Sequence, residues 1–397
     1  MARRSRSSKG GVRPSDGWSF SIPPTIASAM RNATPDETPS REPGAPRVWL
    51  VQSDKLGDNA QLRVLAEALG WPYEVRQVLM KPRYVFGKPR FRASIHHVDM
   101  ARSDPLEPPW PDLVLTVGRR CAMVALWIRR QGGGRPKIVL VGRPKKRLDA
   151  FDLVVAPPQF PVPEADNVIP LALPLMRADP EKLRAARAGW APRLAAMPRP
   201  LTAVLVGGAT RPFRFDRRTA ADLVRGLETM LAREGGSLYL TTSRRTRPEV
   251  VEELRARLPA GSAFHAWRPD GRDNPYYGLL ACADRFVVTG DSVSMMVEVA
   301  RLGRPLAIYD LPLSRAPLER FRQWAGRLLG RDGPLGGVGD ALQRRGLLGV
   351  ARDLRGFHAR LYAEGLAVPF GTPFRPPRRI PDEELDEVVR RVRRLVA

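Results

Sequence analysis

Short apolar runs recur along the chain, and most are followed by a segment whose apolar positions repeat with helical spacing. The first run is "RVWLVQ" at 47–52, and "AQLRVLAEALG" at 60–70 follows it with Leu62, Leu65 and Leu69 on one helical face. Runs this continuous indicate strands of a parallel sheet that is covered on both sides. The pattern therefore predicts repeated β-α units.

The β-α alternation occurs twice. The first series holds the strands "RVWLVQ", "YEVRQV", "DLVLTV", "KIVLV" and "FDLVVAP", and the second holds "LTAVLVGG", "SLYLTT", "SAFHAW", "RFVVT" and "PLAIYD". We predict an α/β protein with two doubly wound, Rossmann-like parallel-sheet domains that face a central cleft. The predicted parts are a basic tail over 1–46, an N-terminal domain over 47–198, a C-terminal domain over 199–330, and a helical extension over 331–397 that packs partly on the body.

The charge of the chain favours anionic partners. Its 397 residues hold 66 Lys and Arg against 41 Asp and Glu, a formal net charge of +25, which suits nucleotide phosphates or an anionic lipid surface. The basic residues are scattered and form no recognition module, so we expect no nucleic acid.

Cys121 and Cys282 lie in apolar segments and predict a reducing compartment. No apolar run reaches the roughly 18 residues of a membrane helix, so membrane contact would be peripheral.

Both ends of the chain are basic. The first 46 residues are rich in Arg, Ser, Pro and Gly and show no periodicity, which favours a disordered tail over a mitochondrial transit peptide. The stretch "PDEELDEVVRRVRRLVA" at 381–397 predicts a helix that begins acidic and ends basic. Its apolar stripe consists of Leu385, Val388, Val389, Val392 and Val396. We interpret it as a helix packed on the body; contact with an anionic membrane is the alternative.

The loops after the predicted strands carry the candidate chemistry, because open parallel sheets bind ligands beyond the carboxyl ends of their strands. In the second domain these loops are "VGGATRPFRFD", "TTSRRTR", "AWRPDGRDNPYY" and "TGDSVS". Gly, Ser, Thr and Arg supply the amides, hydroxyls and guanidinium groups that bind phosphate oxygens. Neither a P-loop, nor G-x-G-x-x-G, nor an Asp-x-Asp pair occurs. We therefore expect no metal and no cofactor, with helix ends and arginines neutralising the phosphates.

The stretch "TGDSVSMMVEVARL" at 289–302 has more polar groups than a crossover helix needs. A glycine loop with two serines at a helix start offers a diphosphate site. Glu298 lies one turn after Ser294, too far into the helix to close a capping box. It could accept two hydrogen bonds from a ribose diol; a solvated surface glutamate is the alternative.

Five motifs resemble those of the mitochondrial-fission ELM family. They are "NPYYGLLACADRFVVTGDSVSMMVEVARLGRPLAIYDL", "LVGGATRPFRFD", "LYLTTSRRTRPE", "TVGRR" and "SDKLGDNAQ", within about 47–327. Bacterial members of that family are described as nucleotide-sugar glycosyltransferases of the GT-B fold, and plant members recruit fission machinery. The resemblance thus implies a GT-B-like chain whose C-terminal domain binds a nucleotide-sugar donor.

The resemblance also implies roles for residues of the second domain. Glu298 would bind the ribose, and Trp267 and Arg268 would lie near the base. The residues that would bind or line the donor diphosphate are Gly290, Asp291, Ser292, Ser294, Ser243, Arg244, Gly207 and Gly208.

Catalysis would depend on the first domain. An inverting transferase needs a general base near the acceptor hydroxyl, and Asp58 and Asp54 in "SDKLGDNAQ" are the candidates; Asp58 stands where many GT-B enzymes carry histidine. Capping of the helix at Asn59 is a competing role for Asp58, and a retaining enzyme would need no base. The other residues expected on the acceptor side are Gly57, Asn59, Gln61, Gly118 and Arg119.

Our leading hypothesis is a cytoplasmic, metal-independent glycosyltransferase that moves a sugar from a nucleotide-diphosphate sugar to a cell-envelope acceptor. Its basic surface would hold it at the inner face of the cytoplasmic membrane. The alternatives are a catalytically inactive peripheral membrane adaptor and a nucleotide-sugar epimerase. The oligomeric state is left open.

Overall fold

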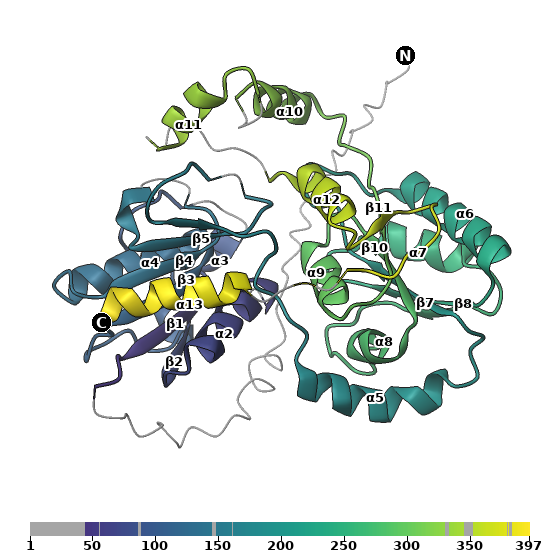
Figure 1. Cartoon of the computed structure of the whole chain (residues 1–397), viewed down its shortest axis with the longest axis horizontal. Coiled ribbons are helices and arrows are strands. Elements are labelled where there is room, and N and C mark those ends of the chain that lie inside the picture. The colour runs from purple at the N-terminus through teal and green to yellow at the C-terminus, as the bar shows by residue number, and fades with distance from the viewer. Residues whose placement is uncertain are drawn as a thin grey trace, which may run out of the picture. The chain divides into compact units, whose positions relative to one another are not determined.

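The fold is built on two sheets, each of six strands that all run parallel (Figure 1). This confirms the predicted α/β class with two Rossmann-like domains; the cleft between them stays a prediction. The computed structural model describes residues 44–54, 56–85, 89–144, 148–160, 162–329, 333–344, 352–378, 380 and 383–397. Nearly all of the predicted tail over 1–46 lies outside the described residues.

The first sheet has the strand order β2-β1-β3-β4-β5-β6. Its strands are β1 (Val48–Gln52), β2 (Tyr73–Gln77), β3 (Leu113–Val117), β4 (Lys137–Val141), β5 (Leu153–Ala156) and β6 (Val168–Pro170). A three-residue strand leaves no recognisable pattern, so β6 is not among the predicted strands. Side chains alternate along β1: Val48 enters the layer that holds α2 (Leu56–Leu69), and Trp49 enters the layer that holds α4 (Gly118–Gln131). The sheet is thus buried on both faces, as the apolar runs predict.

The last helix, α13 (Glu383–Val396), completes the core on the α2 side of this sheet. Leu385, Val388 and Val392 are 9%, 0% and 0% exposed. The predicted packing on the body is confirmed, and the apolar stripe is covered by protein rather than available to a membrane. Within the described residues, no helix is both long and apolar enough to cross a membrane.

The second sheet has the strand order β12-β11-β10-β7-β8-β9. Its strands are β7 (Leu201–Val206), β8 (Ser237–Thr242), β9 (Ala263–His265), β10 (Arg285–Thr289), β11 (Leu306–Tyr309) and β12 (Val368–Pro369). The helices of this part of the chain are α6 (Arg217–Glu234), α7 (Pro248–Arg257), α8 (Tyr276–Cys282), α9 (Val293–Arg301), α10 (Pro317–Leu329), α11 (Gly336–Arg344) and α12 (Leu354–Ala363). Asp216 caps α6, because its carboxylate accepts the Thr219 amide at 2.9 Å.

The second domain also takes in segments from outside 199–330. Helix α5 (Pro180–Leu194) packs on α8, and Leu173, Ala178 and Leu194 belong to the core of the second sheet. Strand β12 pairs with β11, and α12 packs in the same core. The C-terminal extension is therefore divided: α12 and β12 complete the second domain, whereas α13 completes the first.

The described residues of the segment 81–111 pack on the α4 side of the first sheet. The short helices of the first domain are α3 (Pro82–Val85), η1 (Met100–Arg102) and η2 (Leu148–Ala150). Val98 and Leu106 join the buried layer at 1% and 4% exposure. His97 is 0% exposed, and its Nε2 lies 3.1 Å from the Arg120 carbonyl oxygen. Burial lowers the pKa of His97 from 6.5 to about 4.

This buried histidine predicts acid sensitivity of the first domain. Because the pKa of His97 is lower in the folded chain than the unfolded value of 6.5, the unfolded chain binds the proton more tightly. The contribution of neutral His97 to the free energy of unfolding is complete above the unfolded pKa of 6.5 and is lost as the pH falls toward about 4. At pH 5 the loss amounts to about 2 kcal/mol. Hydrogen exchange of the first sheet should reveal this loss between pH 7 and pH 5.

The variant His97→Gln keeps an amide that can donate to the Arg120 carbonyl but cannot titrate, so this part of the pH dependence should disappear. His265→Gln in the second sheet is the control and should leave it intact. The same pH dependence in His97→Gln as in the wild type would contradict the assignment.

Candidate functional site

The strand orders place the predicted loops at the switch points of the two sheets. In the second sheet β7 and β10 are neighbours. Strands β8 and β9 extend the sheet on the far side of β7, and β11 and β12 extend it on the far side of β10. In the first sheet the same relation holds for β1 and β3. Loops that diverge at such a point form the usual ligand site of an open parallel sheet. The glycine loops that follow β7 and β10 meet this condition.

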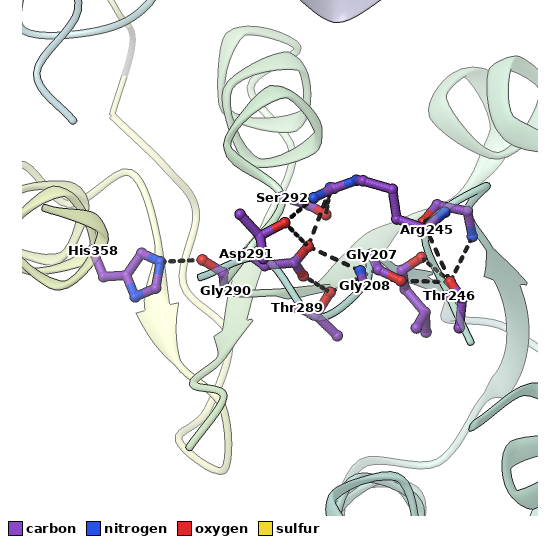
Figure 2. Close-up of polar contacts among 12 residues, drawn as sticks. Gly207, Gly208, Arg245, Thr246, Thr289, Gly290, Asp291, Ser292 and His358 are labelled. Carbon is purple, nitrogen blue, oxygen red and sulfur yellow. Dashed lines mark hydrogen bonds and ion pairs between the residues drawn. The ribbon is translucent and has the colours of Figure 1, made fainter. Parts of the chain in front are cut away.

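A buried carboxylate joins these two loops (Figure 2). Asp291 is 4% exposed; its Oδ2 accepts the Gly208 amide at 2.9 Å, and its Oδ1 accepts the Thr289 hydroxyl at 2.9 Å. The Thr289 oxygen in turn accepts the Gly207 amide at 2.8 Å. Burial raises the pKa of Asp291, while Arg245 and the Gly208 amide oppose that shift. Asp291 therefore links the β7 loop to the β10 loop through hydrogen bonds.

Arg245 brings the loop after β8 into the same network (Figure 2). Its Nη2 lies 3.1 Å from Asp291 Oδ2 and 3.3 Å from Ser292 Oγ, and its Nη1 donates to the Thr210 hydroxyl. The Asp291 side chain is fully buried in this pair, whereas the Arg245 side chain is 47% exposed. The guanidinium group is thus oriented by the protein, on a side chain that is only partly covered.

The two glycines after β7 are needed because the loops approach each other closely. A Cβ on Gly207 would lie 2.1 Å from Ser292 Oγ and 2.4 Å from Asp291 Oδ1, and one on Gly208 would lie 2.2 Å from the Arg245 carbonyl oxygen. Thr246 closes the contact, since its hydroxyl donates to the Gly207 carbonyl at 2.5 Å. Close packing between the loops therefore requires glycine at both positions, whether or not the chain also turns there.

A histidine from α12 holds the β10 loop from outside this network. His358 is 2% exposed; its Nε2 lies 2.8 Å from the Gly290 carbonyl oxygen and its Nδ1 lies 2.8 Å from Asp310 Oδ1. The ring stacks on Phe213, with centroids 6.2 Å apart. A Cβ on Gly290 would lie 2.6 Å from His358 Cε1. The conformation of the predicted diphosphate loop thus depends on a helix near the C-terminus.

Glu298 has a protein partner. Its Oε2 accepts the hydroxyl of Tyr276, from the first residue of α8, at 2.5 Å. Burial raises the pKa of the half-buried Glu298, and the bond from Tyr276 opposes the shift. The carboxylate is therefore oriented toward α8 and not simply solvated, as the alternative interpretation assumed. Its role as a ribose ligand stays a prediction.

The other predicted donor residues surround the network at different depths. Ser292 is 1% exposed and Ser294 is half-buried; Ser243 and Trp267 are half-buried, and Arg244 and Arg268 are exposed. Asp291 and Ser292 use their side chains to organise the loops, so contact with phosphate stays a prediction for the backbone amides at the start of α9. The Trp267 amide donates to Thr242 Oγ1 at 2.9 Å, which ties the β9 loop to β8.

The acceptor-side residues of the first domain follow β1 and β3. Asp58 is half-buried in the first turn of α2, which begins at Leu56. Its alternative role as the helix cap is therefore wrong, because a cap precedes the first turn. Asn59 instead donates from Nδ2 to the Ser53 carbonyl at 2.6 Å. Asp54 is exposed, and a catalytic role for either aspartate stays a prediction.

The remaining acceptor-side residues differ in accessibility. Gly57 is exposed and Gln61 is 4% exposed. Gly118 opens α4 with a φ of 76°, a conformation that favours glycine. Arg119 is half-buried, and its Nη2 donates to the Pro89 carbonyl at 2.5 Å. These residues follow β1 and β3, the neighbouring strands at the switch point of the first sheet, where the sequence predicts the acceptor.

Sequence reasoning missed several residues of the donor network: Arg245, Thr246, Thr289, Tyr276 and His358. The first four lie inside motifs quoted in the sequence analysis. The sequence does not show which of two neighbouring residues, such as Arg244 and Arg245, makes the contact. His358 carries no local signal, because its partner Gly290 is 68 positions away.

Gly207→Ala should destabilise the second domain, because the added methyl group would overlap Ser292 and Asp291 in a closely packed site. Overpacking of this kind costs about 1–3 kcal/mol. Urea unfolding of Gly207→Ala and Gly189→Ala would measure the difference. Gly189 is a matched control within α5, since nothing lies within 4 Å of its added Cβ. Equal stability of the two variants would show that the loops can separate without cost.

The sequence profile of the family described as Mitochondrial fission ELM1 matches residues 57–331. The "Mitochondrial fission protein ELM1" of Arabidopsis thaliana is 30% identical over 249 residues, which cover 57% of this chain and 57% of that protein. An uncharacterised protein of Rickettsia prowazekii (strain Madrid E) is 22% identical over 303 residues, which cover 67% of this chain and 83% of that protein. The match with the Arabidopsis relative thus spans little more than half of its length.

Solved structures with a related fold include a UDP-GlcNAc 2-epimerase from Methanocaldococcus jannaschii, with a TM-score of 0.44 and 10% identity over 88% of this chain and 99% of that chain. A glycosyl transferase of family 9 from Veillonella parvula has a TM-score of 0.39 and 10% identity over 68% and 82%. Likenesses at this level support no conclusion about what this chain binds. The family profile, in contrast, covers more than half of the residues, and the chain belongs to the mitochondrial fission ELM1 family.

Proposed function

We propose that the second domain binds the diphosphate of a nucleotide-diphosphate sugar at the switch point between β7 and β10. The observation that carries the proposal is Arg245, whose guanidinium group is held by Asp291 and Ser292 while its side chain as a whole is 47% exposed. It stands beside the start of α9, whose Ser292 cap makes no side-chain hydrogen bond to the helix. The first amides of α9 and the guanidinium group could therefore bind phosphate oxygens together.

The proposed ribose ligand is Glu298, between one and two turns into the same helix. Tyr276 occupies Oε2 of its carboxylate, and Oε1 accepts no hydrogen bond from the described residues. Oε1 could then accept a hydrogen bond from a ribose hydroxyl. Tyr276 would orient the carboxylate for that contact.

In the proposed reaction the acceptor hydroxyl oxygen bonds to the anomeric carbon of the sugar. The bond from that carbon to the diphosphate oxygen breaks, and the nucleoside diphosphate leaves with the electron pair. Arg245 and the α9 amides would stabilise the departing charge, so the step needs no metal ion. In an inverting reaction, Asp58 or Asp54 would take the proton of the acceptor hydroxyl. A cell-envelope acceptor and a location at the inner face of the membrane belong to this proposal.

A second candidate function is a peripheral membrane adaptor without catalysis. The name of the Arabidopsis relative, a mitochondrial fission protein, and an exposed apolar face on α10 and α11 favour it. Nucleotide-sugar binding separates the two functions. If binding occurs, product analysis without an acceptor distinguishes transfer from epimerisation.

Calorimetric titration with UDP-, GDP- and ADP-sugars tests the proposed donor site. We expect one of them to bind and a CMP-sugar, with its single phosphate, to bind more weakly. Arg245→Gln should weaken the binding about tenfold or more, because a charge-assisted hydrogen bond to phosphate is lost. Arg218→Gln is the matched control, since Arg218 is an exposed arginine on α6 of the same domain. Absence of binding to every diphosphate sugar, or equal losses in the two variants, would refute the assignment.

Glu298→Gln tests the ribose contact with the nucleoside diphosphate that binds best. The variant should weaken its binding about tenfold and leave that of the 2′,3′-dideoxy analogue unchanged, because the analogue lacks the diol. Tyr276→Phe removes only the orienting bond and should have a smaller effect. If Glu298 merely links α9 to α8, both variants will lower the melting temperature and neither will distinguish the two nucleotides.

A further inference from the structure

The large apolar side chains that the described residues expose gather in one segment. Leu318, Phe321 and Trp324 on α10 are 61%, 61% and 58% exposed. Leu335, just before α11, and Val338, in its first turn, are 43% and 52% exposed. Elsewhere in the described chain, Met100 alone has a comparable exposure, at 41%. A cluster of this kind marks a surface that meets a partner. We refer to these five residues as the α10–α11 face.

The geometry of α10 shows which side the helix presents. Leu318, Phe321 and Trp324 are three positions apart and form one stripe; the last two rings contact each other, with centroids 5.8 Å apart. Glu319, on another side of the helix, is only 6% exposed. The helix therefore turns an acidic residue inward and its largest apolar residues outward, the reverse of the usual arrangement.

The two helices hold each other closely, so the face is a defined surface. The Leu335 amide donates to the Leu328 carbonyl at 3.0 Å. A Cβ on Gly339 would lie 1.9 Å from the Leu329 carbonyl oxygen, so only glycine permits this approach of α11 to α10. Figure 1 shows the two helices following each other along the chain.

A cationic pocket adjoins the α10 end of this face. It has a volume of about 340 Å³, and its lining includes Leu318 of the face together with Arg211, Arg214 and Arg247. Two acidic residues also line the pocket. Asp216 caps α6 and pairs with Arg214 at 3.5 Å, and Glu319 is only 6% exposed. Arg211 and Arg247 are exposed, and two exposed arginines next to an apolar helix suit a ligand with a phosphate head and apolar chains.

We propose that the α10–α11 face and its arginine pocket dock the protein on an anionic phospholipid bilayer. Phe321 and Trp324 enter the interface, where aromatic rings are favoured, and the pocket binds a lipid phosphate. The net charge of +25 adds attraction to such a surface. The membrane contact is thus placed on α10 and α11 rather than on α13, whose apolar stripe is buried. The proposal does not depend on nucleotide binding.

Co-sedimentation of the full chain with vesicles tests this proposal. The wild type should bind phosphatidylglycerol-containing vesicles and remain in solution with pure phosphatidylcholine. Phe321→Glu with Trp324→Glu should weaken the partition roughly tenfold or more, because two exposed aromatic anchors are lost. Arg211→Gln with Arg247→Gln should weaken it roughly fivefold per arginine. Neither pair should change the melting temperature, since all four side chains are exposed.

Matched controls keep the result specific to this surface. Met100→Glu removes an exposed apolar residue of the first domain, and Arg255→Gln with Arg390→Gln removes two exposed arginines elsewhere; both should bind like the wild type. Equal losses in the controls, or equal binding to neutral and anionic vesicles, would overturn the proposal. So would light scattering that shows a dimer converted to a monomer by Phe321→Glu with Trp324→Glu, because the face would then cover a second copy of the chain.

Discussion

The candidate site depends on one buried carboxylate. Burying an ion costs several kcal/mol unless partners compensate for the lost water, and Asp291 receives hydrogen bonds from Gly208 and Thr289 and an ion pair from Arg245. These partners lie at or just beyond the ends of three different strands, β7, β8 and β10. The loops can satisfy the carboxylate only in one mutual arrangement, so a single charge specifies the geometry of the whole switch point. The same requirement excludes a side chain at Gly207.

The C-terminal extension is part of both domains rather than an addition to them. His358 of α12 bonds to the carbonyl of Gly290, and the apolar stripe of α13 fills the first core. Segments far along the chain thus complete the core of the first domain and the loop of the second. A shortened chain would lose core packing and loop geometry together, although its strands were intact.

Much of the fold could be predicted from the sequence because it is encoded locally. Continuous apolar runs indicated ten strands, and the helical stripe of α13 was correctly interpreted as packed. The short strands β6 and β12 were missed because two or three residues show no period. The cap proposed for Asp58 was wrong because the helix begins at Leu56, before Asp58, rather than at Asn59. Of two adjacent arginines, the pattern favoured Arg244, and only the path of the loop brings Arg245 to Asp291.

Periodicity and composition by themselves determined the two β-α series, the glycine and serine loops at strand ends, and the excess of positive charge. Tertiary structure alone decided which loops meet, since strand order makes β7 and β10 neighbours across about eighty residues of chain. It also decided which of two amphipathic helices buries its apolar side chains. Those of α13 pack in the first core, whereas Phe321 and Trp324 of α10 remain exposed. The reason is physical. A local pattern states which side chains avoid water, but what covers them depends on contacts between distant segments.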